Sequence, residues 1–120
     1  MRPVTVAEVV AALRSGEYQQ TSGCLYDGSA YCCLGVAEAI AGAEWMALND
    51  SAGHYQDDYG STAMTSDGAR HDLGEWGEFL DARAPGAGTA CVAHVLADLN
   101  DNGKTFDVIA DEIEAIRERL

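Results

Sequence analysis

The chain has 120 residues, of which 48% are hydrophobic and 22% are charged, and 20 acidic residues against 7 basic ones give a formal net charge of −13. A chain of this size buries enough apolar surface to fold as one domain over residues 1–120 without disulfides or metals. The acidic surface repels nucleic-acid phosphates and anionic lipids, so we expect neither nucleic acid nor membrane as a partner. A basic protein surface is a compatible partner, and a solvated acidic surface without any partner would have the same composition.

The beginning of the chain contains no recognisable targeting segment. Met1-Arg2-Pro3 leads directly into a helical pattern, and no apolar stretch has the length of a signal peptide or a membrane span. We therefore expect a cytoplasmic protein. In that compartment the four cysteines are expected to be reduced thiols.

The first predicted element is a helix of about ten residues. Thr5 and Glu8 have the spacing of a capping box, in which the hydroxyl accepts from a first-turn amide and the carboxylate reaches back. Apolar residues then recur at helical spacing, and Gly16 is a natural end.

Residues 24–31 change to an extended pattern on either side of Asp27-Gly28. This dipeptide supplies the positive φ values of a tight turn, so the segment predicts two short strands in a β-hairpin. A second helix follows from residue 32 or 33 to Gly42. Because it is almost entirely apolar, we expect it at the centre of the fold.

The middle of the chain gives a weaker signal. Residues 49–70 are rich in Gly, Ser, Asp and Tyr and predict a long surface loop, a feature that is often functional in small domains. Residues 72–84 then predict a short helix with its apolar side chains at Leu73, Trp76, Phe79 and Leu80.

The last third predicts two helices packed as a helical hairpin. Thr89 is expected to cap a helix that ends at Asn100, Asn102-Gly103 supplies a left-handed turn, and Thr105 caps the final helix. One face of that final helix is apolar. Another face is acidic and carries Asp107, Asp111, Glu114 and Glu118.

These elements together predict an α+β fold that is mainly helical. We expect about four helices, one or two short β-hairpins, and the C-terminal helical hairpin closing the core.

Cys33 is the candidate nucleophile of an enzymatic interpretation. It follows an extended segment and opens a helix, where the helix dipole lowers a thiol pKa. His71 and His94 are the candidate bases, so a Cys33-dependent hydrolase or amidase is one hypothesis. No known nucleophile motif surrounds Cys33, and a buried core cysteine is the simpler interpretation.

A zinc-stabilised interaction module is a second alternative. Cys91 and His94 lie at i and i+3 of a predicted helix, and Cys24 with Cys32 or Cys33 would complete a four-ligand set. The spacing differs from paired Cys-x-x-Cys knuckles, so three distant segments would have to meet. Zinc is therefore an alternative. If the protein is instead a non-enzymatic binding protein, we expect no cofactor.

Two groups of residues are candidates for binding a small ligand. Tyr55, Tyr59 and Arg70 belong to the predicted long loop, where aromatic and polar side chains together suit a ligand pocket. Gln19 and Gln20 lie between two elements and have no evident apolar role, so folding alone does not explain them.

Three segments carry a family resemblance: residues 12–20 (ALRSGEYQQ), 31–36 (YCCLGV) and 99–114 (LNDNGKTFDVIADEIE). They resemble small proteins encoded by bacteriophages and prophages, over nearly the whole chain and least over residues 43–88. The resemblance implies an accessory protein acting in the bacterial cytoplasm, and it carries over no catalytic residues.

The first hypothesis for function is therefore a non-enzymatic phage accessory protein that binds a host protein or a small host metabolite. Small phage proteins of this kind include counter-defence factors, so sequestration of a nucleotide signal is a more specific version. Arg70, Arg83 and Lys104 would then have to hold the phosphates.

Overall fold

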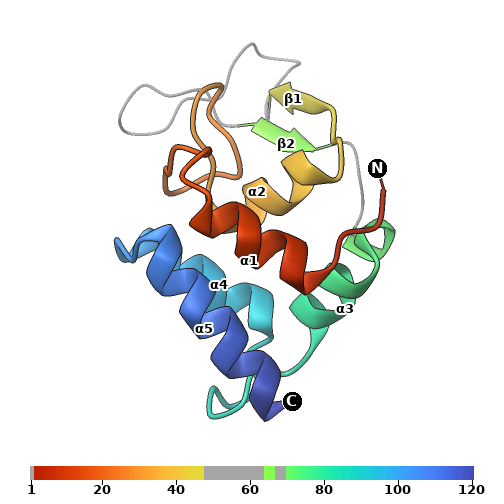
Figure 1. Ribbon diagram of the computed structural model, residues 1–120, viewed down its shortest axis with the longest axis vertical. Helices are drawn as coiled ribbons and strands as arrows, with labels where there is room; N and C mark the ends of the chain where they lie inside the picture. The colour runs from red at the N-terminus through yellow and green to blue at the C-terminus, as the bar shows by residue number, and fades with distance from the viewer. Residues whose placement is uncertain (1, 48–63, 67–69) are drawn as a thin grey trace.

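Helices are the main regular structure in the computed structural model, which describes residues 2–47, 64–66 and 70–120 (Figure 1). Side chains from residue 46 to residue 71 lie outside this description. The helices are α1 (Val6–Arg14), α2 (Cys33–Ile40), the 3₁₀ helix η2 (Arg70–Leu73), α3 (Glu75–Asp81), α4 (Val92–Asp101) and α5 (Phe106–Arg119). Two short strands, β1 (Trp45–Ala47) and β2 (Met64–Ser66), pair in antiparallel register.

The predicted first helix is confirmed, together with its cap. Thr5 Oγ1 accepts a hydrogen bond from the backbone amide of Glu8 at 3.1 Å. The helix then buries the side chains of Val6, Val9, Val10 and Leu13. Local chemistry fixes where α1 begins, and burial of one apolar face fixes which side it turns to the core.

α2 begins one residue after Cys32, which is its N-cap residue. Gly35, in the first turn of α2, is buried because the backbone of Leu25 crosses directly over it. A Cβ atom at position 35 would overlap the Leu25 carbonyl oxygen and lie 2.8 Å from the carbonyl carbon. Only glycine permits this crossing of loop and helix.

The predicted hairpin at residues 24–31 is wrong. This segment forms an irregular loop held by isolated bridges, one of which joins Tyr26 to Tyr31. Asp27 and Gly28 do make a turn, but the Asp27 carboxylate accepts from the amides of Ser29 and Ala30 at 2.9 and 2.8 Å. The side chain therefore organises a local turn that does not continue into paired strands.

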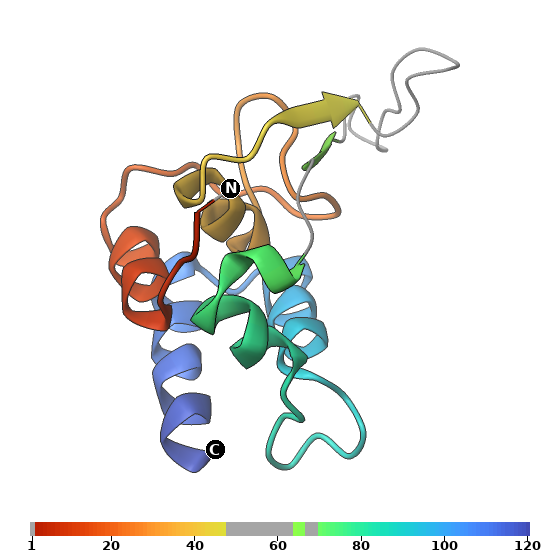
Figure 2. The ribbon, with the colours of Figure 1, turned by 90° about the vertical axis from the view of Figure 1, so that its right-hand side faces the viewer.

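The α+β assignment is also wrong, because residues 24–31 form no hairpin and the described residues are mainly helical. The described residues form five α-helices, where about four were expected, so the protein is a mainly helical domain. Each of the two paired strands has only three residues, and they lie at the opposite end of the molecule from the C-terminal end of α5 (Figures 1 and 2).

The core lies between the helices, where α1 packs on α5, α2 on α4, and α4 on both α3 and α5. Trp76, Leu96, Ile109 and Ile113 are its largest fully buried side chains. The predicted cap of α5 is confirmed, since Thr105 Oγ1 accepts from the amide of Val108 at 3.4 Å. The predicted cap of α4 is wrong: that helix begins after Cys91 and not after Thr89.

Candidate functional site

Cys33 lies at the start of α2, as the sequence predicts, but its thiol is part of the core. The residue is fully buried, and Sγ donates to the carbonyl oxygen of Leu96 at 3.5 Å. Burial raises the pKa of the Cys33 thiol far above its usual value, and the neighbouring Cys32 adds to this effect. Desolvation outweighs the helix dipole here, so the geometry does not generate a reactive thiolate.

Cys32 is also buried, and its sulfur has a structural role. Sγ accepts from the backbone amide of Gly35 at 3.4 Å and so caps α2. Burial raises the pKa of Cys32 to about 11. The adjacent thiols are thus both protonated near neutral pH.

The other candidate bases and zinc ligands are dispersed. His94 is exposed, and its Nε2 lies 3.4 Å from Asp98 Oδ2 on the next turn of α4. Cys91 is the N-cap residue of the same helix. Cys24 lies beside Cys32, in the irregular segment of residues 18–31 between α1 and α2, which we call the 18–31 loop. Within the part of the chain that the structure describes, no three His, Cys, Asp or Glu side chains gather in a way that could hold a metal ion.

Tyr55, Tyr59 and Arg70 are the predicted ligand-binding residues of the long loop. Tyr55 and Tyr59 lie outside the described residues. Arg70 and His71 begin η2, but their side chains lie outside the description.

Gln20 belongs to a hydrogen-bond network that the sequence does not predict. Its Nε2 donates to Asn100 Oδ1 at 2.9 Å and to the carbonyl oxygen of Lys104 at 2.7 Å. Asn100 Oδ1 also accepts from the Cys33 amide at 3.2 Å, and Asn100 Nδ2 donates to the Thr21 carbonyl at 2.7 Å. Asn100 is the one buried polar residue among those described, and it joins the 18–31 loop, α2 and α4.

Gln19 is placed differently from Gln20. Its carbonyl oxygen accepts from the Tyr31 amide at 2.8 Å, while the residue is exposed beside a shallow cavity of about 260 Å³ near Phe106. The structure thus gives Gln19 a backbone role in the loop and leaves its side chain at the surface.

Four half-buried aromatic residues form a cluster on the 18–31 loop and β1. Tyr26 stacks on Tyr31 with ring centroids 4.4 Å apart, Tyr18 meets Tyr31 edge-on at 5.4 Å, and Trp45 lies 5.0 Å from Tyr26. Burial and the neighbouring Tyr26 raise the pKa of Tyr31. Stacked rings at these distances stabilise the loop that the hairpin prediction did not explain.

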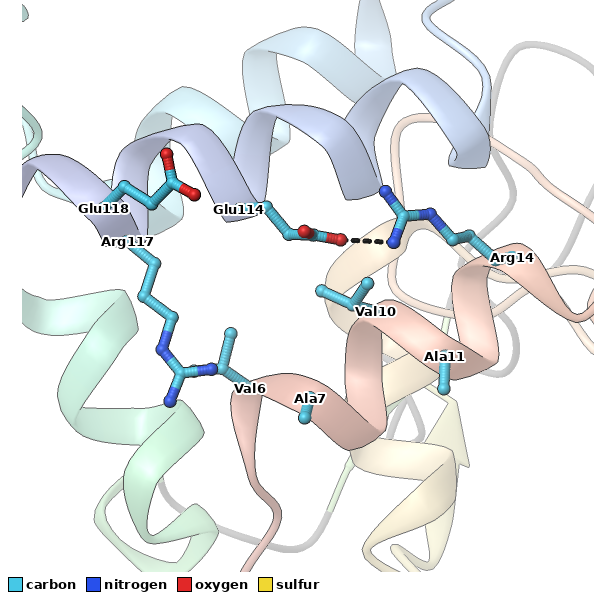
Figure 3. A pocket seen from close by; sticks show the side chains of 8 residues that line it. All are labelled: Val6, Ala7, Val10, Ala11, Arg14, Glu114, Arg117 and Glu118. Carbon is cyan, nitrogen blue, oxygen red and sulfur yellow. Dashed lines mark hydrogen bonds and ion pairs between the residues drawn. The ribbon is translucent and has the colours of Figure 1, made fainter.

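A concave surface lies between α1 and α5, and we call it the α1–α5 groove. Its volume is about 390 Å³. Figure 3 shows Val6 and Val10 of α1 and Arg117 of α5 pointing into the space between the two helices, with Arg14 at one end and Arg117 at the other. The groove is lined by Val6, Ala7, Val10, Ala11, Arg14, Glu114, Arg117 and Glu118.

The floor of the groove is apolar and belongs to α1. Val6 and Val10 are buried there, whereas Ala7 and Ala11 are exposed. The two alanines are four residues apart and therefore lie on one face of the helix. The result is a shallow apolar trough that no larger side chain fills.

Ion pairs close both ends of the groove. Arg14 on α1 donates to Asp111 at 2.6 Å and to Glu114 on α5 (Figure 3). Arg117 on α5 lies 3.5 Å from Glu75 of α3. The carboxylates beside Arg14 raise the pKa of its guanidinium, mainly through the hydrogen bond with Asp111.

An acidic row runs along α5, on the face that the sequence predicts to be acidic. It consists of Asp107, Asp111, Glu114 and Glu118, all exposed. Its members Glu114 and Glu118 line the groove, and Asp107 lines the separate cavity near Phe106. Arg14 pairs with the two middle members. The two outer members have no bonding partner among the residues that the structure describes.

Comparison with known proteins identifies the family. A family model described as Domain of unknown function (DUF8296) matches residues 1–117. The chain belongs to this family. No curated protein and no solved structure matches it. None of the helices described for this DUF8296 chain combines the length and apolarity that crossing a bilayer requires.

Proposed function

We propose that this DUF8296 chain is a phage accessory protein without enzymatic activity, which binds a basic surface of a host protein. The α1–α5 groove carries the proposal, because it combines an apolar floor with Glu114 and Glu118 on its α5 side. These two carboxylates belong to the acidic row, which continues along α5 beyond the groove to Asp107. Apolar contact area supplies affinity at protein interfaces, and complementary charge supplies orientation and a fast encounter. The resemblance to phage-encoded proteins implies that binding occurs in the cytoplasm of the bacterial host.

The distribution of cations supports a basic partner. Among the side chains that the structure describes, Arg2, Arg14 and Arg117 pair with carboxylates of the chain itself. With a net charge of −13, the surface attracts cations over distances comparable to the Debye length. The hydrolase alternative lacks such support, because the Cys33 thiol is buried and protonated.

The experiment starts from the immobilised chain in a bacterial lysate at low salt, with an unrelated protein of similar size and charge as the control. Any protein enriched only by the chain is then purified, and binding is measured by calorimetry. We expect defined stoichiometry and an affinity that falls as salt is added. If no purified candidate binds better to this chain than to the acidic control, the proposal is wrong.

A small host metabolite is the second candidate, and the cluster of Tyr18, Tyr26, Tyr31 and Trp45 favours it. Partly exposed aromatic rings can stack on a planar ligand. Native mass spectrometry of gently purified protein tests this candidate. A retained adduct would support it, and an apo mass that stays unchanged when nucleotides are added in excess would count against it.

A further inference from the structure

We infer that the α1–α5 groove receives a basic amphipathic helix of the partner. In this arrangement the apolar side chains of the partner helix lie in the trough between α1 and α5, and its Lys and Arg side chains lie along the acidic row. The inference rests on the proposed function and specifies its partner. Helices that lay an apolar face in a groove are a common mode of peptide recognition.

The size of the trough favours side chains as its occupants. A volume of about 390 Å³ is at the small end of ligand pockets, and its floor offers mainly methyl groups. Ala7 and Ala11 are exposed and small, so a helix can approach α1 closely at these positions.

The spacing of the acidic row favours a helix as the ligand. Its members are separated by four, three and four residues, which places one carboxylate on each successive turn of α5. The row spans about 16 Å at the α-helical rise. A partner helix with cations at the same intervals therefore matches the row in register, with the outer carboxylates of Asp107 and Glu118 open to pair with it.

Arg14 shows how the acidic row holds a cation. Its guanidinium comes from a neighbouring helix and bonds to Asp111 and Glu114 together. Asp107 and Glu118 extend this arrangement in both directions and have no such partner within the described residues. The outer carboxylates are therefore the ones open to cations from another protein.

A second copy of this chain fits the groove poorly. In a two-fold symmetric dimer the same surface occurs on both sides of the interface, so two acidic rows would lie together. Like charges placed together at an interface oppose association. The charge pattern thus selects a basic partner helix over self-association.

The probe is a fluorescent helical peptide of about five turns, with leucines on one face and lysines at the intervals of the acidic row. A peptide of the same composition in scrambled order is its control. Fluorescence anisotropy at low salt reports binding to the full chain. We expect the patterned peptide to bind about tenfold more tightly than the scrambled one, a difference of about 1.4 kcal/mol.

Groove-blocking variants test the location. Ala7→Gln with Ala11→Gln fills the trough from exposed positions that tolerate glutamine in a helix. We expect this pair to weaken peptide binding at least about tenfold. Ala115→Gln, also exposed on α5 but outside the groove, should leave binding unchanged. Circular dichroism and thermal melts verify that each variant folds.

Charge variants test the row independently of the trough. Asp107→Asn with Glu118→Gln should weaken binding more than Glu17→Gln with Glu78→Gln, although both pairs change the net charge equally. Arg14→Gln should tighten binding, because it releases two carboxylates for the peptide. Equal effects of the two charge pairs would show that only the net charge matters.

The inference is overturned if the scrambled peptide binds equally well, if the blocking variants have no effect, or if the chain dimerises through the groove. Its failure can be told apart from failure of the proposed function. A purified host protein that binds the Ala7→Gln, Ala11→Gln variant with unchanged affinity leaves the proposed function intact and moves the binding surface elsewhere.

Discussion

Glu75 of α3 holds the first amide of α1: its Oε1 accepts a hydrogen bond from the Val6 backbone N–H at 2.7 Å. The same oxygen lies 3.5 Å from the Arg117 guanidinium on α5. One carboxylate therefore connects three helices at one end of the α1–α5 groove. It satisfies an amide that no residue within α1 can satisfy, and it fixes the position of Arg117.

Replacing Glu75 with Ala should destabilise the protein by about 1–2 kcal/mol, the usual cost of losing a helix cap. Glu75→Gln keeps an acceptor for the Val6 amide and should cost less. Urea unfolding of the two variants measures the difference. Equal stabilities of Glu75→Ala and the wild type would show that water replaces the carboxylate without loss.

Asn100→Ala should destabilise the protein more than Glu75→Ala does, with a loss of about 2–4 kcal/mol in the free energy of unfolding. The change removes the partners of the buried Cys33 amide and the Thr21 carbonyl. Gln20→Ala removes only the exposed part of the network and should cost less. Hydrogen exchange is the second measurement: amides of the 18–31 loop should exchange faster in Asn100→Ala. Unchanged loop protection would contradict the role assigned to Asn100.

Gly35→Ala should cost more than about 2 kcal/mol, because the added methyl group meets the Leu25 backbone, which cannot move without opening the loop. Gly16→Ala is the matched control. Its φ of 78° imposes backbone strain, but nothing lies within 4 Å of the new methyl group. Thermal unfolding should rank Gly35→Ala as clearly the less stable of the two, and the reverse order would refute the close crossing.

The buried thiols predict a loss of stability at alkaline pH. The pKa of Cys32 is raised from 9.0 to about 11 by burial, so the unfolded chain releases this proton first. Stability should therefore fall as pH rises from about 9 to about 11, and the thiol should make no pH-dependent contribution well below pH 9. Urea unfolding across this range should show a smaller fall in Cys32→Ala than in the wild type. Parallel curves would exclude the thiol as the cause.

The helix boundaries were predicted best where the determining chemistry is local. Thr5 and Thr105 cap their helices through amides three residues away, which a sequence displays directly. The 24–31 hairpin was predicted wrongly because contacts from outside the segment, in addition to the local turn at Asp27, replace strand pairing. The Tyr31 amide donates to the Gln19 carbonyl oxygen, and the Leu25 backbone crosses Gly35. The backbone groups of this segment therefore form hydrogen bonds without pairing as β-strands.

The candidate site was predicted only in part. The acidic face of α5 follows from sequence periodicity, but its position beside Ala7 and Ala11 depends on how two helices distant in sequence pack. The sequence does contain an indication of the hydrogen-bond network around Asn100. Asn100 lies four residues after Leu96 and eight after Val92, on the buried face of α4, where a polar residue requires buried partners.

The most direct measurement of the proposed docking mode is an NMR titration of the isotopically labelled chain with the patterned lysine peptide. The groove predicts that the largest amide shifts cluster on α1 and α5, around Ala7, Ala11, Glu114 and Glu118. Shifts scattered over acidic residues of all helices, or concentrated on the aromatic cluster of the 18–31 loop and β1, would contradict it.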